Sequence, residues 1–302
     1  MILEIMEDDA LKRLKKIDTQ SIDVIIADPP YNLGKDYGNN NDQKTFDEYI
    51  YFSREWIKES HRVLKVTGTI YIFMGVRFIA YLYSILEKEY GFNFNSWITW
   101  HYTQGLGKTK GFSPRHDDIL MFTKTKNYKF FLDDVRVPQK HYRSINNMRG
   151  ANPGDVWTFS HVHYCNTNRQ PHPTQKPEAL IERMVLVSSE ENDLVLDPFS
   201  GSGTTLRVCQ QLNRNCIGIE LNPEYVTLTK ERLEQPFAGF DSIDERMERI
   251  PNDLNDIQIR NEYLNNHKTW FLKRHPNIVT SFEKKLEKTY KTKKQIGLFN
   301  DL

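Results

Sequence analysis

Residues 22–31 read IDVIIADPPY, a run of apolar and β-branched side chains that ends in an acid, two prolines and a tyrosine. Such a run is typical of a strand buried on both faces of a parallel sheet. The prolines end the strand because neither has an N–H to donate to a neighbouring strand. Asp28 and Tyr31 are therefore expected at the carboxyl end of a strand, where open α/β sheets bind ligands. An ordinary exit from strand to turn is the alternative for this stretch alone.

The end of this strand carries groups that suit a particular kind of ligand. Asp28 and the carbonyl of Pro29 both accept hydrogen bonds, and the ring of Tyr31 offers a face for stacking. A planar group with an exocyclic amine, such as adenine or cytosine, matches this combination.

A second strand and glycine-rich turn follow far downstream. Residues 193–205 read DLVLDPFSGSGTT, and a helix is expected from Leu206. The next strand, residues 215–220, ends in Glu220, 17 residues after Gly203. A glycine turn lets a ligand approach the backbone, and an acid at the following strand tip accepts hydrogen bonds from ribose hydroxyls. The pattern predicts a nucleoside-binding βαβ unit, and it lacks the Gly-Lys-Ser/Thr of a phosphate loop.

These motifs resemble those of the DNA amino-methyltransferases of restriction-modification systems that use S-adenosylmethionine. The similarity is to the group in which the catalytic motif precedes the cofactor motif (the beta group). Four segments match in the family's order: the catalytic turn at 28–31, a helix start at 172–178, the cofactor loop at 197–204 and the ribose segment at 219–225. The resemblance covers about residues 4 to 235 and leaves the rest of the chain unmatched.

The resemblance implies a catalytic set and a cofactor set of residues, and no metal site. The catalytic set is Asp28, Pro29, Pro30 and Tyr31. The set expected to hold S-adenosylmethionine is Asp8, Asp9, Asp28, Thr174, Lys176, Asp197, Phe199, Ser200, Gly201, Ser202, Gly203, Thr204, Glu220, Leu221 and Asn222.

Individual roles also come from the resemblance. Asp197 is expected to accept from the cofactor's ammonium, Thr174 and Lys176 to meet its carboxylate, and Glu220 to take the ribose hydroxyls. Asp8 or Asp9 is expected near the adenine of the cofactor. Either acid could instead cap a short amphipathic helix over residues 9–17, and the sequence does not choose between the two.

The implied reaction is transfer of a methyl group to the exocyclic amino nitrogen of a base in DNA. That atom is inaccessible in the duplex, so the base must be flipped out, with Tyr31 stacking against it. Family members with Asp at the first motif position mostly methylate adenine N6, which makes adenine the leading target and cytosine N4 the alternative. An NAD-dependent oxidoreductase and a non-catalytic DNA-binding subunit are alternatives from other classes. The first leaves the turn at 28–31 unexplained, and the second would tolerate loss of motif residues that this chain retains.

Residues 103–170 differ in character from the rest, with basic side chains interleaved with aromatic ones. This mixture is typical of a surface that neutralises phosphates and reads base edges, so we expect a target-recognition region that binds double-stranded DNA. A solvated insertion with ordinary charge is the alternative. The DNA-binding candidates are Lys108, Lys110, Arg115, Lys140, Arg143 and Arg149.

The predicted fold is α/β, a mostly parallel twisted sheet with helices on both faces and an inserted recognition region. We expect a catalytic half at 1–102, the recognition region with some scaffold strand at 103–170, and a cofactor-binding half at 171–235. A charged, helix-prone extension follows at 236–302, for which a dimer contact or a further DNA contact is open.

Composition favours an intracellular enzyme. The net charge of +1 gives no overall attraction to nucleic acid, so charge must be judged locally. The cysteines, Cys165, Cys209 and Cys216, are odd in number and widely spaced, which favours reduced thiols. No apolar run is long enough for a membrane span. We expect a cytoplasmic protein, with a homodimer and a cognate restriction endonuclease as open possibilities for partners.

Overall fold

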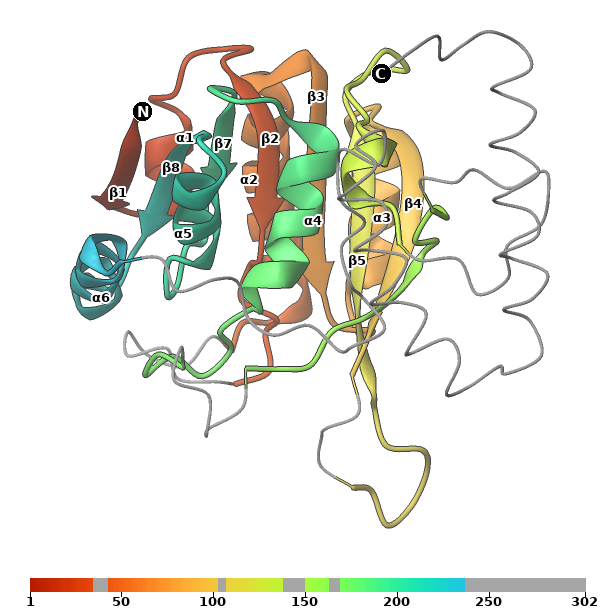
Figure 1. The fold of residues 1–302 in the computed structure, drawn as a ribbon. Helices are drawn as coiled ribbons and strands as arrows, with labels where there is room; N and C mark the ends of the chain where they lie inside the picture. Colours follow the sequence, from red (N-terminus) through yellow and green to blue (C-terminus); the bar gives the residue numbers. More distant parts are fainter. Residues whose placement is uncertain (35–42, 103–106, 138–149, 163–168, 237–302) are drawn as a thin grey trace, which may run out of the picture. The chain divides into compact units, whose positions relative to one another are not determined.

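The structure, a computed structural model, describes residues 1–34, 43–102, 107–137, 150–162 and 169–236. Its centre is an eight-stranded sheet with the order β1-β8-β7-β2-β3-β5-β4-β6 (Figure 1). The strands are β1 (Leu3–Glu7), β2 (Ile22–Ala27), β3 (Leu64–Met74), β4 (Asn93–His101), β5 (His116–Thr123), β6 (Val156–Thr158), β7 (Leu194–Asp197) and β8 (Asn215–Glu220).

The sheet is mostly parallel. Neighbouring strands from β1 through β8, β7 and β2 to β3 pair in parallel, whereas β5 runs antiparallel between β3 and β4. The short β6 pairs in parallel with β4. β2, from the catalytic half, lies directly beside β7, from the cofactor half, so the two predicted halves share one sheet.

Helices cover both faces of the sheet (Figure 1). The helices are α1 (Ala10–Leu14), α2 (Phe46–Val63), α3 (Ile79–Ser84), α4 (Glu178–Ser188), α5 (Thr204–Gln211) and α6 (Pro223–Glu234), with a π-helical turn η1 (Ile85–Glu89) and a 3₁₀ turn η2 (Leu132–Val135). Along β2, Ile25 and Ala27 join the core that contains residues of α1, α2 and α3. Val24 and Ile26 join the core that contains residues of α4 and α5. This alternation explains why β2 is apolar apart from Asp23, and the sheet with helices on both faces confirms the predicted fold class.

Most elements lie close to their predicted positions. α2 begins with a capping box, in which Thr45 accepts from the backbone N–H of Glu48 and the Glu48 side chain accepts from the backbone of Thr45. α3 continues directly into η1, and the two differ in their hydrogen-bonding pattern. β6 was not predicted, because three residues carry no readable periodicity.

A second compact unit holds Arg136, Val137 and residues 150–152 of the described chain. Within it, Val137 and Ala151 form an antiparallel bridge. The predicted extension at 236–302 lies outside the described residues apart from Pro236.

Candidate active site

A large cleft opens at the carboxyl ends of the parallel strands. Among the acids that line it, three lie at the ends of neighbouring parallel strands: Asp28 after β2, Asp197 at the end of β7 and Glu220 at the end of β8. Its volume is about 1560 Å³. Pockets for a single small molecule are usually about 300–1,000 Å³, so this cleft has room for two ligands side by side.

The turn after β2 is fixed from two sides. The hydroxyl of Tyr49 on α2 donates to the carbonyl of Pro30 at 2.8 Å. Asn32, in the left-handed region at φ 56°, pairs with the backbone of Lys44 through both side-chain groups, at 3.0 and 2.6 Å. These contacts hold Asp28, Pro29, Pro30 and Tyr31 along the wall of the cleft, as predicted for the catalytic turn.

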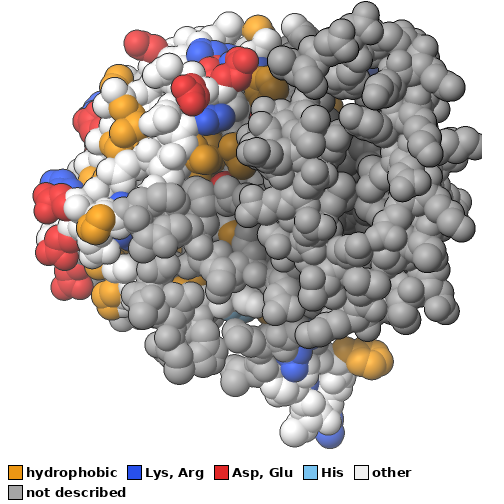
Figure 2. Space-filling model, viewed as in Figure 1, with side chains coloured by type: hydrophobic (Ala, Val, Ile, Leu, Met, Phe, Trp, Pro, Cys, Tyr) orange, Lys and Arg blue, Asp and Glu red, His pale blue; other side chains and the backbone are white. Residues whose placement is uncertain are grey.

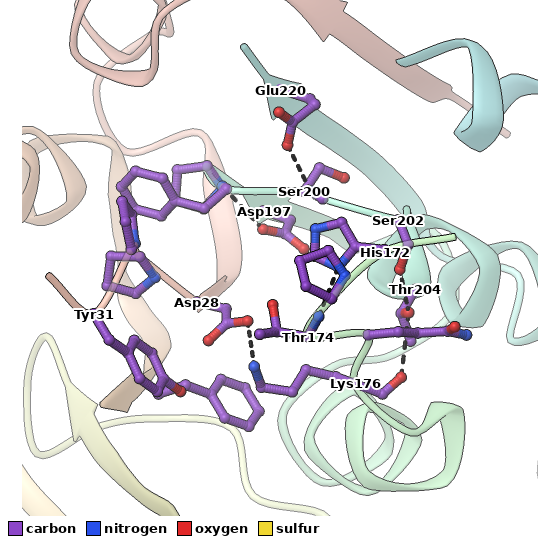
Figure 3. Close-up of a pocket in the computed structure, with 18 of the residues that line it drawn as sticks. Asp28, Tyr31, His172, Thr174, Lys176, Asp197, Ser200, Ser202, Thr204 and Glu220 are labelled. Carbon is purple, nitrogen blue, oxygen red and sulfur yellow. Dashed lines mark hydrogen bonds and ion pairs between the residues drawn. The ribbon is translucent and has the colours of Figure 1, made fainter. Parts of the chain in front are cut away.

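Asp28 presents one paired and one unpaired oxygen to the cleft. Its Oδ2 accepts from the ammonium of Lys176 in an ion pair that spans 148 positions of sequence (Figure 3). Its Oδ1 is buried and has no hydrogen-bond partner among the described residues. A buried acceptor without a partner costs free energy, so this oxygen is ready to receive a donor from a ligand.

Lys176 lies where the two halves of the site meet. Its ammonium is 5.1 Å from the ring centroid of Phe73 and 5.6 Å from that of Tyr31. Its carbonyl accepts from the hydroxyl of Thr204, the first residue of α5. The sequence indicated a role for Lys176 at the cofactor's carboxylate. In this structure its ammonium donates to Asp28, a contact that no local pattern could reveal, and the role at the cofactor's carboxylate stays a prediction.

Asp197 is held by the start of its own loop. Its carboxylate accepts from the backbone N–H of Phe199 at 3.1 Å and from the hydroxyl of Thr205 at 2.6 Å. Burial raises the pKa of Asp197 to about 7, and the nearby Asp28 and Glu220 add to the rise. A cationic ligand would relieve this cost, because it favours the ionised carboxylate.

The two glycines of the loop at 197–204 are required for different reasons. Gly201 has φ 50°, and a Cβ there would lie 2.9 Å from Nε2 of His172. Gly203 has φ 72°, and a Cβ there would lie 2.4 Å from Cγ2 of Thr229 on α6. Gly201 lines the cleft, whereas Gly203 lies behind it and lets α6 pack closely. Gly203 therefore allows close packing, and its cofactor role stays a prediction.

A buried arginine supports the loop from behind. Arg232 of α6 donates to the carbonyl of Ser202 at 2.9 Å and to the hydroxyl of Thr204 at 3.1 Å. Its other nitrogen donates to Glu178 of α4 at 2.5 Å. Loop, α4 and α6 are thereby tied together by one side chain.

The Glu220 carboxylate is oriented by backbone donors. It accepts from the N–H groups of Gly201 at 2.7 Å and Asn222 at 2.8 Å, and burial raises its pKa. Each oxygen keeps capacity for a further donor, such as a hydroxyl. Leu221 is exposed on the cleft wall, whereas the Asn222 side chain accepts from Glu224 N–H at 2.9 Å as the N-cap of α6.

Asp8 and Asp9 lie beside this end of the cleft and both line it. Asp9 is the N-cap of α1 and accepts from the N–H of Lys12 at 3.0 Å, so the capping interpretation is confirmed for that residue. Asp8 donates its N–H to the carbonyl of Glu220 at 3.1 Å, which places it directly beside the acid predicted to bind the ribose.

The remaining predicted cofactor residues gather around the same space. Thr174, Phe199, Ser200, Ser202 and Thr204 all line the cleft. The Ser200 hydroxyl is buried and has no hydrogen-bond partner among the described residues. Together with the acids, these groups fit S-adenosylmethionine: carboxylates for its ammonium and ribose, and a glycine turn that lets it approach the backbone.

One wall of the cleft was missed by the sequence reasoning. Trp100, Tyr102 and His161 line it, and the ring of His161 lies 4.8 Å from that of Trp100 and 4.0 Å from that of Tyr102, between centroids. Asp117 forms a hydrogen bond with Tyr102 in the same wall. Burial raises the pKa of Tyr102 to about 12, so its phenol stays protonated and can donate. No spacing links these residues in sequence.

The predicted DNA-binding residues are only partly described. Lys108 and Lys110 are exposed on the connection between β4 and β5, and Arg115 adjoins the start of β5. Lys140, Arg143 and Arg149 lie outside the described residues.

Other sequence expectations concern metals, thiols and membranes. Within the described ranges, no group of His, Cys, Asp and Glu side chains could hold a metal ion. Cys209 and Cys216 are buried free thiols, and Cys165 lies outside the described residues. None of the helices in the described part of the chain has the length and apolar character of a membrane span.

Comparisons with known proteins agree with this geometry. Residues 22–231 match the N6/N4 methyltransferase family, described as DNA methylase. The chain is 62% identical over 283 residues to type II methyltransferase M.HpaI of Haemophilus parainfluenzae, covering 93% of this chain and 90% of that one. It is 39% identical over 243 residues to DNA adenine methyltransferase YhdJ of Escherichia coli, covering 76% and 82%. The crystal structure of the M1.HpyAVI–SAM complex superposes with a TM-score of 0.58 at 28% identity, covering 78% of this chain and 100% of that one.

Proposed function

The chain belongs to the family of N6/N4 DNA methylases and is an S-adenosylmethionine-dependent DNA methyltransferase, and we propose that it methylates the N6 amino group of adenine at specific sites. The observation that carries this proposal is the buried, unpartnered Oδ1 of Asp28 beside the carbonyl of Pro29. An exocyclic amine has two hydrogens, and these two acceptors match them.

The chemistry of the acceptor turn follows from its geometry. The amino nitrogen of a base is a poor nucleophile because its lone pair is delocalised into the ring. Hydrogen bonds to Asp28 and to the Pro29 carbonyl favour a pyramidal nitrogen with its lone pair free. When bound, S-adenosylmethionine supplies an electrophilic methyl group on a sulfonium. The chain contributes orientation and electrostatics, which are the main sources of acceleration for such a transfer.

We assign the cofactor to the part of the cleft between Asp197, Gly201 and Glu220. Asp197 would accept from its ammonium and Glu220 from its ribose hydroxyls, with Asp8 close to the nucleoside end. Thr174 and Lys176 would meet its carboxylate, which requires the Lys176 ammonium to leave Asp28. The base would enter on the side of Tyr31, toward the wall formed by Trp100, Tyr102 and His161.

Adenine is favoured over cytosine by two observations. Asp occupies the first position of the catalytic turn, and a relative with 39% identity is named a DNA adenine methyltransferase. The direct test is to incubate the protein with DNA and labelled S-adenosylmethionine, digest the DNA and separate its nucleosides. N6-methyldeoxyadenosine is the expected product. N4-methyldeoxycytidine would instead support the cytosine alternative, and the absence of any labelled nucleoside would refute the activity.

The proposal also includes the molecules with which the protein interacts. DNA is the substrate of the family, and the basic candidates Lys108, Lys110 and Arg115 support contact through the β4–β5 connection. The similarity to a type II methyltransferase favours a cognate restriction endonuclease in the same system and action in the cytoplasm. The homodimer stays a prediction, and so does the division of the chain into regions that begin at residues 1, 103, 171 and 236. Light scattering with and without DNA would decide the oligomeric state.

A further inference from the structure

Residues 107–115, the described part of the connection between β4 and β5, project away from the sheet at the bottom of Figure 1. At Phe112 the side chain is 100% exposed, the highest value among the exposed large hydrophobic residues of the described chain. The loop is closed by the N–H of Lys108, which donates to the Ser113 hydroxyl at 2.8 Å. Gly111, at φ 90° with nothing within 4 Å of a Cβ, turns the backbone just before the ring.

The surroundings of this ring are basic. Residues 107–115 read GKTKGFSPR, with three cations and no acid. Hydrophobic and basic side chains lie together at this end of the molecule in Figure 2. A single exposed ring is common on protein surfaces, but a fully exposed ring among three cations beside the cleft suits a binding surface. The partner must combine negative charge outside with an apolar interior, and a stacked DNA duplex has both.

The loop also lies at the mouth of the cleft. Pro114 and Asp117 line the cleft itself. Phe112 is two positions before Pro114, and a chain spans at most about 3.6 Å per residue, so their Cα atoms are within about 7 Å. The ring is therefore held close to the point where a base leaving the duplex must enter.

We propose that Phe112 is a wedge that enters the base stack of duplex DNA at the target site when the target base is flipped out. Flipping breaks stacking and pairing, and an apolar side chain that fills the gap offsets part of that cost. Lys108 and Lys110 contact the flanking phosphates and hold the loop on the duplex. The inference rests on the proposed function, because a wedge is needed only by an enzyme that extrudes a base.

The test compares two duplexes once the recognition sequence has been mapped. One has the target base correctly paired, and the other has a mismatched base opposite it, which already weakens pairing and stacking. Phe112→Ala should lower kcat/KM for methyl incorporation at least 10-fold on the paired duplex and less than 3-fold on the mismatched one. Phe112→Trp should retain activity on both. Methyl incorporation is scored whichever base is modified.

Phe130→Ala is the matched control. Phe130 is another exposed phenylalanine, 42% exposed, but Lys129 beside it donates its N–H to Thr67, at the sheet edge opposite the cleft. This variant should leave both duplexes unaffected. Cofactor affinity, measured by calorimetry without DNA, should be unchanged in all variants.

Three results would overturn the proposal. Equal loss on both duplexes would make Phe112 a general docking contact, and no loss on either would leave it without a role in flipping. Loss of activity in Phe112→Ala together with a lowered melting temperature would show a structural role. A wild-type protein that methylates neither duplex would refute the proposed function itself, which is a separate outcome.

Discussion

At the scale of single residues, Asp28 is the group on which we propose that methyl transfer depends. We expect Asp28→Asn to lower the rate of methyl incorporation at least 100-fold. The amide oxygen of Asn is a weaker acceptor than a carboxylate oxygen, and the NH2 group of the new side chain would point a donor at the amine of the base. Since Asn keeps the volume and a hydrogen bond to Lys176, affinity for S-adenosylmethionine should stay within a few-fold. Filter-based methyl incorporation and calorimetry measure the two effects. Activity within 10-fold of wild type would remove Asp28 from the mechanism.

Asp197 should make cofactor binding depend on pH. Its pKa is raised to about 7 in the unliganded protein, so it is largely protonated below pH 7 and ionised above it. A cationic ammonium binds the ionised form, and affinity should therefore fall as pH falls below 7, by up to 10-fold per pH unit. Glu220, whose pKa burial also raises, changes affinity in the same direction.

Calorimetric titrations between pH 5 and pH 8 would test this expectation. Asp197→Asn should bind more weakly than wild type at pH 8 and show a flatter pH profile. The same steep profile in this variant would assign the titration to another group.

The sequence indicated these acids because each one directly follows an apolar strand. It could not indicate the pairing of Lys176 with Asp28, because the two residues are 148 positions apart in the chain. The wall of Trp100, Tyr102 and His161 was also invisible. Trp100 and Tyr102 lie at the end of β4, and His161 follows β6, which pairs with β4, a pairing that periodicity does not encode.

At the scale of elements, the site is stabilised by contacts behind it. α5 begins at the glycine turn, α6 packs against Gly203, and Arg232 links α6 to the loop and to α4. The helix signals were readable in sequence, as with Pro223 at the first turn of α6. The contacts of Arg232 could not be predicted, because a lone arginine in a mixed-charge helix is usually solvated.

Arg232→Met should lower the free energy of unfolding by about 3–5 kcal/mol, because it leaves Glu178 charged and buried without its partner. Urea unfolding followed by circular dichroism measures this. Arg54→Met is the control, since the Arg54–Glu89 pair is half exposed and should contribute no more than about 1 kcal/mol. Similar small decreases in the free energy of unfolding in both variants would mean that the buried Arg232–Glu178 pair is not a major contributor to stability.

At the scale of the whole molecule, one sheet joins two functional halves and presents both at one edge. The carboxyl ends of β2, β7 and β8 supply the acids, while the β4–β5 connection projects from the same edge with its lysines. A protein of net charge +1 has no overall field to attract DNA. Attraction must therefore come from local clusters, and the position of the cluster decides where the duplex binds.

Salt dependence of DNA binding should locate that cluster. Each lysine that contacts a phosphate contributes about 1 to the slope of log affinity against log salt concentration. Lys108→Gln and Lys110→Gln should each reduce the slope by about 1 and weaken binding to all sequences alike, with cofactor affinity intact. Lys58→Gln, an exposed lysine in the second half of α2, is the control and should leave the slope unchanged. Unchanged slopes for the loop variants would move the phosphate contacts to the other basic residues of 103–170 or to the extension after Pro236. Fluorescence anisotropy from 50 to 300 mM salt would distinguish these outcomes, because only a loss of phosphate contacts changes the slope as well as the affinity.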